Sequence, residues 1–457
     1  MNSKYTLFIA VLCALGMNVT AHAVPIAIID SGTDLNHKDL QAVQWTNAGD
    51  EDDAVDNDDN GYIDDTHGWN FAENNNKLFD KRLLGTFSPD VRTFFEYQLH
   101  MLNGVATADE LAWIDAHKKD PAFIAELNTY GNFVHGSHVA GIASKDSKDA
   151  QIMGIKLIPT KQPKPFAVIE SNGMVRAAQR GRGEETKKKL VLKAIEFLGK
   201  QQSQVFGPIS TYVKDQGARV ANCSFGTSHA AAKMLLGPLL KLIFKRDMSE
   251  VELNEYAAFF IDAILKGSQD AFIAPAPNTL FVIAAGNDGT SNDEFPASPA
   301  NIKADNTITV AATNGLSKIA SFSNFGTQMV DVAAPGVGIE STIPGNEYLV
   351  VSGTSQASPR VANVAGQILD MNPELTPGQV KQILMETSDK KAFLADKVKS
   401  GGIVNLNRAV MAAKYSRGSS LTDAIARSVQ DVRDQKETKS IAASSAAEFA
   451  LPLPSVF

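Results

Sequence analysis

Residues 348–370 read YLVVSGTSQASPRVANVAGQILD: a short apolar run, a Ser-Gly turn, and then small and apolar residues at helical spacing. This pattern predicts a strand that turns tightly through Gly353 into a helix running from about Ser355 to Asp370. A serine at such a turn exposes its hydroxyl beside the positive end of the helix. Ser355 is therefore a candidate nucleophile, although helix N-capping is the commoner role for a serine at this position.

Strand-like runs and helical patterns alternate along the chain. Each run is nearly continuous, as expected for parallel strands covered on both faces. Capping boxes at residues 249–252 and 376–379 indicate helix starts between or after the runs. We expect an α/β fold: a doubly wound, mostly parallel sheet with helices on both faces, in three α/β/α layers, with its site at the carboxyl ends of the strands. The runs lie at residues 24–29, 152–158, 218–223, 279–285, 307–312 and 348–351.

Three polar motifs lie at the ends of predicted strands or at the start of a predicted helix. Asp30 ends the first run in Asp-Ser-Gly, HGSHVAG at residues 135–141 predicts a helix with His135 at its N-terminus, and Asn287 follows the run near residue 283. Taken singly, each has an ordinary explanation: a turn or cap, a core or surface histidine, and an Asn-Asp-Gly turn. The spacing of His135 and His138 would also suit zinc, but no neighbouring Glu or Cys completes a zincin-type ligand set.

Taken together, the motifs resemble those of the subtilisin-like serine proteases, the subtilases. Asp-Ser-Gly at residues 30–32, the histidine motif at 135–141 and Gly-Thr-Ser-x-Ala-x-Pro at 353–359 follow the order of the family's three signatures. The resemblance covers about residues 24–413. It implies a catalytic triad of Asp30, His135 and Ser355.

The same resemblance implies roles for four more residues. Asn287 would donate to the oxyanion, and the strand edge that binds the substrate backbone would be Ser224, Phe225 and Gly226. The chain departs from the family pattern beside the nucleophile, where Gln356 and Arg360 replace the usual Met and His. These departures affect the expected shape of the substrate subsites and leave the expected reaction unchanged.

The domain organisation follows from these matches. We expect a catalytic domain at residues 24–415, with a helical insertion at about 76–129 and a basic insertion at about 161–189 that forms a solvated surface loop. Residues 416–457 are Ser/Ala-rich and predict a flexible tail with one helix near 421–436. The usual N-terminal prodomain is not expected, because Asp30 follows the predicted export signal almost at once.

An acidic segment follows the first predicted strand. Residues 50–65 hold nine carboxylates in an Asp/Asn alternation before a Gly turn, which suits a hard cation such as Ca²⁺. A structural calcium ion is the expected cofactor, and none is needed for the chemistry. The alternative is a solvated acidic loop packed under Trp69 and Phe71. The expected ligands are Asp56, Asp58, Asn60 and Asp64.

Composition and the N-terminal sequence indicate where the protein acts and which partners its charge disfavours. The chain has 457 residues, 44% hydrophobic and 21% charged, with a net charge of -8 that does not favour nucleic acid or anionic membranes. Its N-terminus has Lys4, a short apolar run and Ala21-His22-Ala23, the pattern of a signal peptide at residues 1–23. We expect a secreted or periplasmic, monomeric protein with no membrane span. The two cysteines, Cys13 and Cys223, cannot form a disulfide framework.

The resemblance implies a secreted serine endopeptidase that hydrolyses peptides or unfolded proteins through an acyl-enzyme. Two alternatives stay open. A transpeptidase or ligase would use the same triad and would be recognised by its products with an added amine. A catalytically retired, calcium-dependent binding protein would leave Ser355 unreactive toward a phosphonate.

Overall fold

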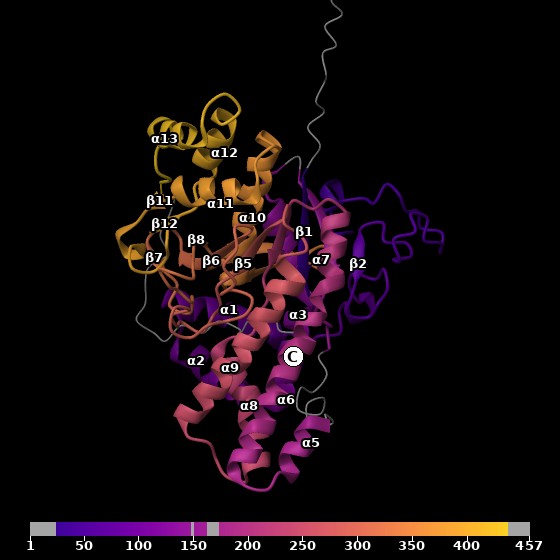
Figure 1. The fold of residues 1–457 in the computed structure, drawn as a ribbon. Helices are drawn as coiled ribbons and strands as arrows, with labels where there is room; N and C mark the ends of the chain where they lie inside the picture. Colours follow the sequence, from indigo (N-terminus) through magenta and orange to yellow (C-terminus); the bar gives the residue numbers. More distant parts are fainter. Residues whose placement is uncertain (1–23, 148–149, 162–172, 437–457) are drawn as a thin grey trace, which may run out of the picture.

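The computed structural model describes residues 24–147, 150–161 and 173–436 (Figure 1). The predicted signal peptide at residues 1–23 lies outside the described residues. The same holds for residues 162–172 of the basic insertion and for residues 437–457 at the C-terminal end.

A single large sheet organises the described residues. It has ten strands in the order β11-β12-β8-β6-β5-β4-β1-β3-β2, with β7 paired to β6. All neighbouring strands from β2 to β12 pair in parallel, and only β11 and β7 pair antiparallel. The strands are β1 Pro25–Asp30, β2 Gly68–Asn70, β3 Gln151–Lys156, β4 Val220–Cys223, β5 Leu280–Ala284, β6 Thr307–Asn314, β7 Lys318–Ile319, β8 Val332–Pro335, β11 Asp389–Lys390 and β12 Gly402–Ile403.

Apolar side chains on both faces of the sheet are buried under helices. In β1, Ile26 and Ile28 belong to one core cluster, whereas Ala27 and Ile29 belong to another. The first core is shared with α3 (Pro121–Ser144), α10 (Thr354–Met371), α11 (Pro377–Glu386) and α12 (Leu406–Tyr415). The second is shared with α7 (Phe206–Asp215) and the π-helical segment η3 (Gln269–Ile273). The prediction of a mostly parallel sheet in three α/β/α layers is confirmed.

The predicted strand at residues 348–351 is not part of this sheet. It is β10 (Glu347–Val351), which pairs antiparallel with β9 (Ile339–Ile343) in a separate hairpin. Glu347 pairs with Ile343, so the strands are joined by a three-residue loop, in which Gly345 and Asn346 adopt positive φ.

The expectation that His135 lies at a helix N-terminus is also wrong. Helix α3 begins at Pro121, where the Asp120 side chain accepts the N–H of Ala122, and it continues through His135 to Ser144. The last helix of the insertion and the helix that carries His135 are thus one element. The insertion also contains η2 (Lys81–Leu83), α1 (Asp90–Asn103) and α2 (Ala108–His117).

The described part of the basic insertion is helical, so the expected surface loop is wrong for residues 173–189. Helices α5 (Gly173–Arg180) and α6 (Glu184–Gln204) pack with α8 (His229–Phe244) and α9 (Glu250–Ser268) around their own apolar core. Apolar residues such as Val175 and Val191 recur at helical spacing and are buried, while the cations between them face outward. The four helices extend together away from the sheet at the bottom of Figure 1.

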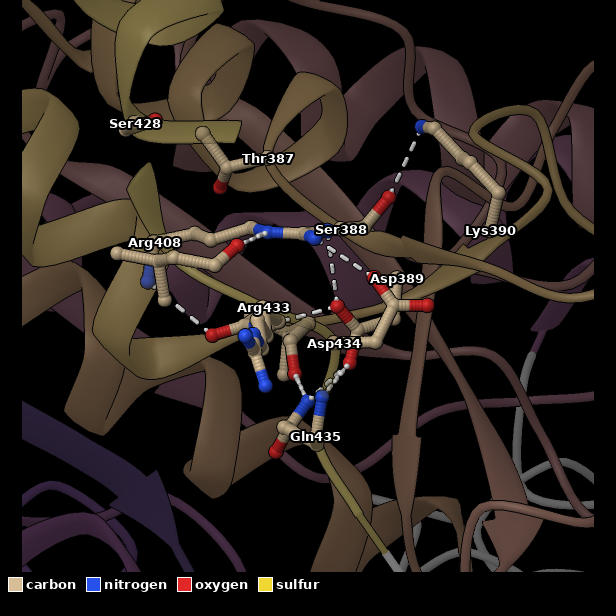
Figure 2. A network of polar contacts seen from close by, with 12 residues as sticks. Thr387, Ser388, Asp389, Lys390, Arg408, Ser428, Arg433, Asp434 and Gln435 are labelled. Carbon is tan, nitrogen blue, oxygen red and sulfur yellow. Dashed lines mark hydrogen bonds and ion pairs between the residues drawn. The ribbon is translucent and has the colours of Figure 1, made fainter. Parts of the chain in front are cut away.

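The tail is attached to the domain at least as far as residue 435. Helix α13 (Leu421–Asp431) packs against α12, and Arg408 and Asp389 bind the backbone and side chains that follow it (Figure 2). The expectation of a flexible tail from residue 416 is therefore wrong for this segment, whereas the helix expected near residues 421–436 is present as α13. The remaining short helices are η1 (Gln41–Val43) and η4 (Ala392–Leu394). Within the described ranges, no helix has the length and apolarity needed to cross a bilayer.

Candidate active site

Asp30 and His135 form a close pair at the carboxyl end of β1. His135 Nδ1 donates to Asp30 Oδ1 over 2.7 Å, and the N–H of Ser31 donates to the same oxygen over 2.7 Å. The carboxylate is fully buried. Helix α3 can approach this closely because residue 136 is glycine: a Cβ there would lie 2.2 Å from the carbonyl oxygen of Gly32.

Ser355 occupies the first turn of α10, directly after the predicted Gly353 turn. It is 3% exposed, and its Oγ donates to the carbonyl oxygen of Ser224 over 3.2 Å. His135 and Ser355 line the same cavity, which has a volume of about 540 Å³. The structure therefore brings the three predicted triad residues from three distant parts of the sequence to one edge of the sheet.

Asn287 lies in the wall of the same cavity, just beyond β5. Its Oδ1 accepts the backbone N–H of Thr354 over 2.9 Å and the Thr354 hydroxyl over 2.8 Å. These two bonds define the orientation of the amide, because only its oxygen can accept them. Sequence reasoning missed the part played by Thr354, although its place between Gly353 and Ser355 could have suggested it.

The predicted substrate edge follows β4. Ser224 is buried, and its Oγ donates to the carbonyl oxygen of Ser355 over 3.0 Å, so it also supports the nucleophile turn. Phe225 is 2% exposed and stacks on Phe206 in the core beneath the cavity. Phe225 and Gly226 both contribute to the cavity wall.

The second histidine of the motif has a structural environment. His138 is fully buried, and its Nε2 lies 3.0 Å from the carbonyl oxygen of Leu349 in β10, so it donates there. Burial lowers the pKa of His138 to about 4, which leaves the ring neutral at neutral pH. Across the parts of the chain that the structure describes, no three His, Cys, Asp or Glu side chains are grouped as metal ligands.

The four predicted calcium ligands do not all converge. Asp56 and Asp58 both accept the N–H of Asn60, whereas Asp64 accepts the N–H groups of residues 53 and 54 on another turn. From that end of the loop, Asp65 accepts from the side-chain amide of Asn60 over 3.1 Å and from that of Asn47 over 2.6 Å. Asp65 is fully buried, burial raises its pKa, and sequence reasoning did not single it out.

The sequence and the fold were compared with those of known proteins. The model of the subtilase family, peptidase S8, matches residues 21–408. That is most of the chain, so the protein belongs to the subtilase family.

Curated relatives are similar over shorter stretches. The alkaline elastase YaB of Bacillus sp. (strain YaB) is 42% identical over 115 residues, 25% of this chain and 29% of that protein. The thermophilic serine proteinase of Bacillus sp. (strain AK1) is 30% identical over 273 residues, 60% of this chain and 51% of that protein. The chain thus spans about half or less of these relatives.

Among solved structures, a cold-adapted subtilisin-like serine proteinase has a TM-score of 0.42 and 20% identity, covering 84% of this chain and 90% of that one. The fold assignment rests on the sheet order and layers described above.

Proposed function

We propose that the protein is a serine endopeptidase that hydrolyses peptide bonds in peptides or unfolded proteins. The observation that carries this proposal is the 2.7 Å contact between Asp30 and His135, together with the cavity that His135 and Ser355 both line. Membership of the subtilase family supports the same reaction class.

Each residue has one part in the proposed reaction. When substrate binds, Ser355 Oγ would exchange its bond to Ser224 for one to His135 Nε2, which takes the hydroxyl proton as Oγ attacks the carbonyl carbon. His135 then gives this proton to the leaving amine. The amine leaves and the substrate's acyl group stays on Ser355 Oγ. Water then attacks this acyl group while His135 takes a proton from the water, and His135 returns the proton to Oγ as the acid product leaves. Asp30 keeps the proton on Nδ1 and stabilises the imidazolium.

The oxyanion would accept from the Ser355 backbone N–H and from the Asn287 amide. Thr354 supports this role because its N–H and its hydroxyl both donate to Asn287 Oδ1. This orients the Asn287 amide, whose NH₂ is the group that carries donor hydrogens. Loss of one such donor lowers kcat by about 10²–10³ in comparable sites.

Export and calcium binding are further proposals. We propose that residues 1–23 are removed as a signal peptide and that the protein acts in the periplasm or outside the cell. We also propose that it acts as a monomer. We also propose that Ca²⁺ stabilises the acidic loop at residues 50–65, on the basis of its charge density.

Ser355→Ala tests the proposed function. It should remove nearly all cleavage of an unfolded protein substrate and all labelling by a fluorophosphonate, because both need Oγ as nucleophile. Ser352→Ala, a buried serine in the wall of the same cavity, is the matched control and should keep both. Phenanthroline should not inhibit the wild type. Equal cleavage by Ser355→Ala and wild type would contradict the mechanism, and absence of labelling would favour a retired binding protein.

A further inference from the structure

The helices α6, α8 and α9 form an arm that is joined to the sheet at one end. Helix α8 follows β4 after a short connection, while α6 continues into α7 and α9 into η3, which both belong to the second core. The opposite ends of the three helices therefore lie at the far end of the arm, at the bottom of Figure 1. With 21 residues, α6 alone extends over about 30 Å.

Two polar contacts join the α5–α6 and α8–α9 connections at this far end. Arg246 Nη2 donates to Glu184 Oε1 over 2.9 Å, and Lys187 Nζ donates to the carbonyl oxygen of Ile243 over 2.8 Å. The start of α6 and the end of α8 thus form one surface together with α5, which packs against both helices. We call residues 173–193 and 241–252 the arm tip.

The arm tip has an excess of cations over carboxylates. Residues 173–193 contain seven Lys or Arg residues and two Glu residues, although the whole chain has a net charge of -8. Ion pairs already engage four carboxylates of the arm tip: Glu184, Asp247, Glu250 and Glu252. Six exposed cations of α5, α6 and the connection between them have no ion-pair partner among the described residues: Arg176, Arg180, Arg182, Lys188, Lys189 and Lys193.

These cations act on their surroundings independently of the acidic remainder of the chain. At physiological salt, charges in water that are more than about 8 Å apart are largely screened from one another. The length of the arm exceeds this distance, so a partner at the arm tip meets the local positive charge and not the net charge of -8. The arm tip therefore favours an anionic partner, in contrast to the chain as a whole.

Two apolar side chains are exposed among the cations of the arm tip. Leu242, near the end of α8, is 42% exposed, and Val251, in the first turn of α9, is 67% exposed. An anionic lipid bilayer suits both features, because its phosphates bind cations and the layer beneath them accepts apolar side chains. An acidic polypeptide would match the charges alone.

We propose that the arm tip binds the surface of an anionic lipid bilayer. Leu242 and Val251 enter the boundary between head groups and acyl chains, and the six cations bind lipid phosphates. The proposal does not depend on the proposed reaction, since none of these residues lines the cavity that contains His135 and Ser355.

Vesicle binding tests the proposal directly. The protein is the Ser355→Ala chain from Val24 onward, which avoids self-cleavage and lacks the apolar run at about residues 6–17 that would itself bind lipid. It should bind vesicles of equal parts phosphatidylglycerol and phosphatidylcholine at least about tenfold more tightly than vesicles of phosphatidylcholine alone, as measured by co-sedimentation. Added salt should weaken the binding, because it screens the lipid phosphates.

Charge removal at the arm tip should weaken this binding. The combined variant Arg180→Gln, Lys189→Gln and Lys193→Gln should lose about tenfold or more in affinity for the phosphatidylglycerol vesicles, because each cation near the surface contributes to binding. The matched control removes the same charge from exposed lysines elsewhere: Lys119→Gln, Lys303→Gln and Lys414→Gln. Its affinity should stay within about twofold of that of the parent protein.

A fluorescent label reports whether Leu242 reaches the lipid. The chain from Val24 onward has a single cysteine, Cys223, which is buried, so Leu242→Cys can be labelled selectively with an environment-sensitive nitrobenzoxadiazole group. Its emission should rise when phosphatidylglycerol vesicles are added. The same label on Val105→Cys, at a position that is 61% exposed in the insertion, should not respond.

Equal binding to the two kinds of vesicle, or an equal loss in the two triple variants, would overturn the proposal. Salt-sensitive vesicle binding without a response of the label at Leu242→Cys would also overturn it, because the apolar contact is part of the proposal. Binding of polyglutamate to the arm tip without binding to vesicles would overturn it in favour of an acidic polypeptide partner. Fluorophosphonate labelling of the wild type tests the proposed function separately.

Discussion

His135 and His138 lie one helical turn apart on α3, yet their surroundings give them different tasks. His135 faces the cavity and donates to the buried Asp30 carboxylate. His138 is enclosed, donates to a backbone carbonyl of β10 and is kept neutral by desolvation. Residue type and spacing alone do not distinguish the two histidines, because their difference lies in burial and in hydrogen-bond partners.

The enclosed His138 predicts a loss of stability in acid. Its pKa is about 4 in the folded protein against 6.5 for the ordinary side chain. Between these values the unfolded chain binds a proton that the folded protein does not, so the free energy of unfolding falls as pH drops. The fall should reach about 3 kcal/mol and level off below pH 4, from about 1.4 kcal/mol per pKa unit. Urea unfolding at pH 7.5, 5.5 and 4, on the Ser355→Ala background to prevent self-cleavage, measures it.

Removing the titrating ring tests the cause. His138→Gln should be less stable at pH 7.5 but should lose less stability between pH 6.5 and 4 than its parent. A pH dependence that is the same in His138→Gln and its parent would refute the assignment.

At the scale of elements, helix starts are predicted better than strand partners, because a helix start depends on neighbouring residues and a strand partner lies far away in the sequence. Capping boxes at Thr376 and Ser249 marked true helix starts, because the side chain and backbone that form a cap are three residues apart. The strand β10 was assigned to the wrong sheet, because an apolar run does not state its partner. The helix that carries His135 begins at Pro121, well before the histidine motif from which a helix start was predicted, because a local motif does not show how far a helix extends before it.

The C-terminal helix is held by a buried ion pair, shown in Figure 2. Asp389 is fully buried and accepts from Arg408 Nη1 over 3.0 Å and from the backbone N–H of Gln435 over 2.9 Å. Arg408 Nε donates to the carbonyl of Val432, and Nη2 binds Asp434. These contacts fasten the segment after α13 to the edge of the sheet.

Arg408→Met should lower the free energy of unfolding by about 3–5 kcal/mol, because it leaves the Asp389 carboxylate buried without its cation. The matched control is Arg427→Met, whose ion pair with Asp431 is exposed on both sides and should change stability by less than about 1 kcal/mol. Denaturant unfolding of both variants measures the difference. Similar losses in the two would mean that the buried pair does not stabilise the tail.

The acidic loop carries the calcium prediction. Nine carboxylates within residues 50–65 should repel one another without a cation, so added Ca²⁺ should raise the melting temperature by binding the folded state. Asp56→Ala with Asp58→Ala should abolish the rise, whereas Asp52→Ala, on the exposed part of the same loop, should keep it. Differential scanning fluorimetry with Ca²⁺ or with a chelator measures the effect. Identical melting curves in the two conditions would exclude a stabilising calcium site.

On the scale of the whole molecule, the sheet could be predicted from the sequence and the walls of the cavity could not. Asp30 and Asn287 lie at one edge of the sheet because β1 and β5 are parallel, whereas Ser355 follows β10 of the separate hairpin and lies in the first turn of α10. The walls of the cavity come instead from α3 and α8, where segments separated by about a hundred residues meet through tertiary packing. No local pattern in those helices distinguishes a residue that lines the cleft from one on an ordinary surface.

One contact joins the first described residue, Val24, to the end of α10, and cleavage of the predicted signal peptide would change its charge. The backbone N–H of Val24, the residue after the predicted signal peptide, donates to Asp370 Oδ1 at the end of α10 over 3.1 Å, and Val24 is 7% exposed. Cleavage after Ala23 would turn this amide into an ammonium and the hydrogen bond into an ion pair, which is stronger.

Asp370→Asn should therefore destabilise a chain beginning at Val24 by about 1–2 kcal/mol more than a chain beginning at His22, in which the charge lies two residues away. Unfolding of the four proteins forms a double-mutant cycle, and added salt should reduce the coupling. Equal losses in the two chains would show that the new N-terminus gains nothing from Asp370.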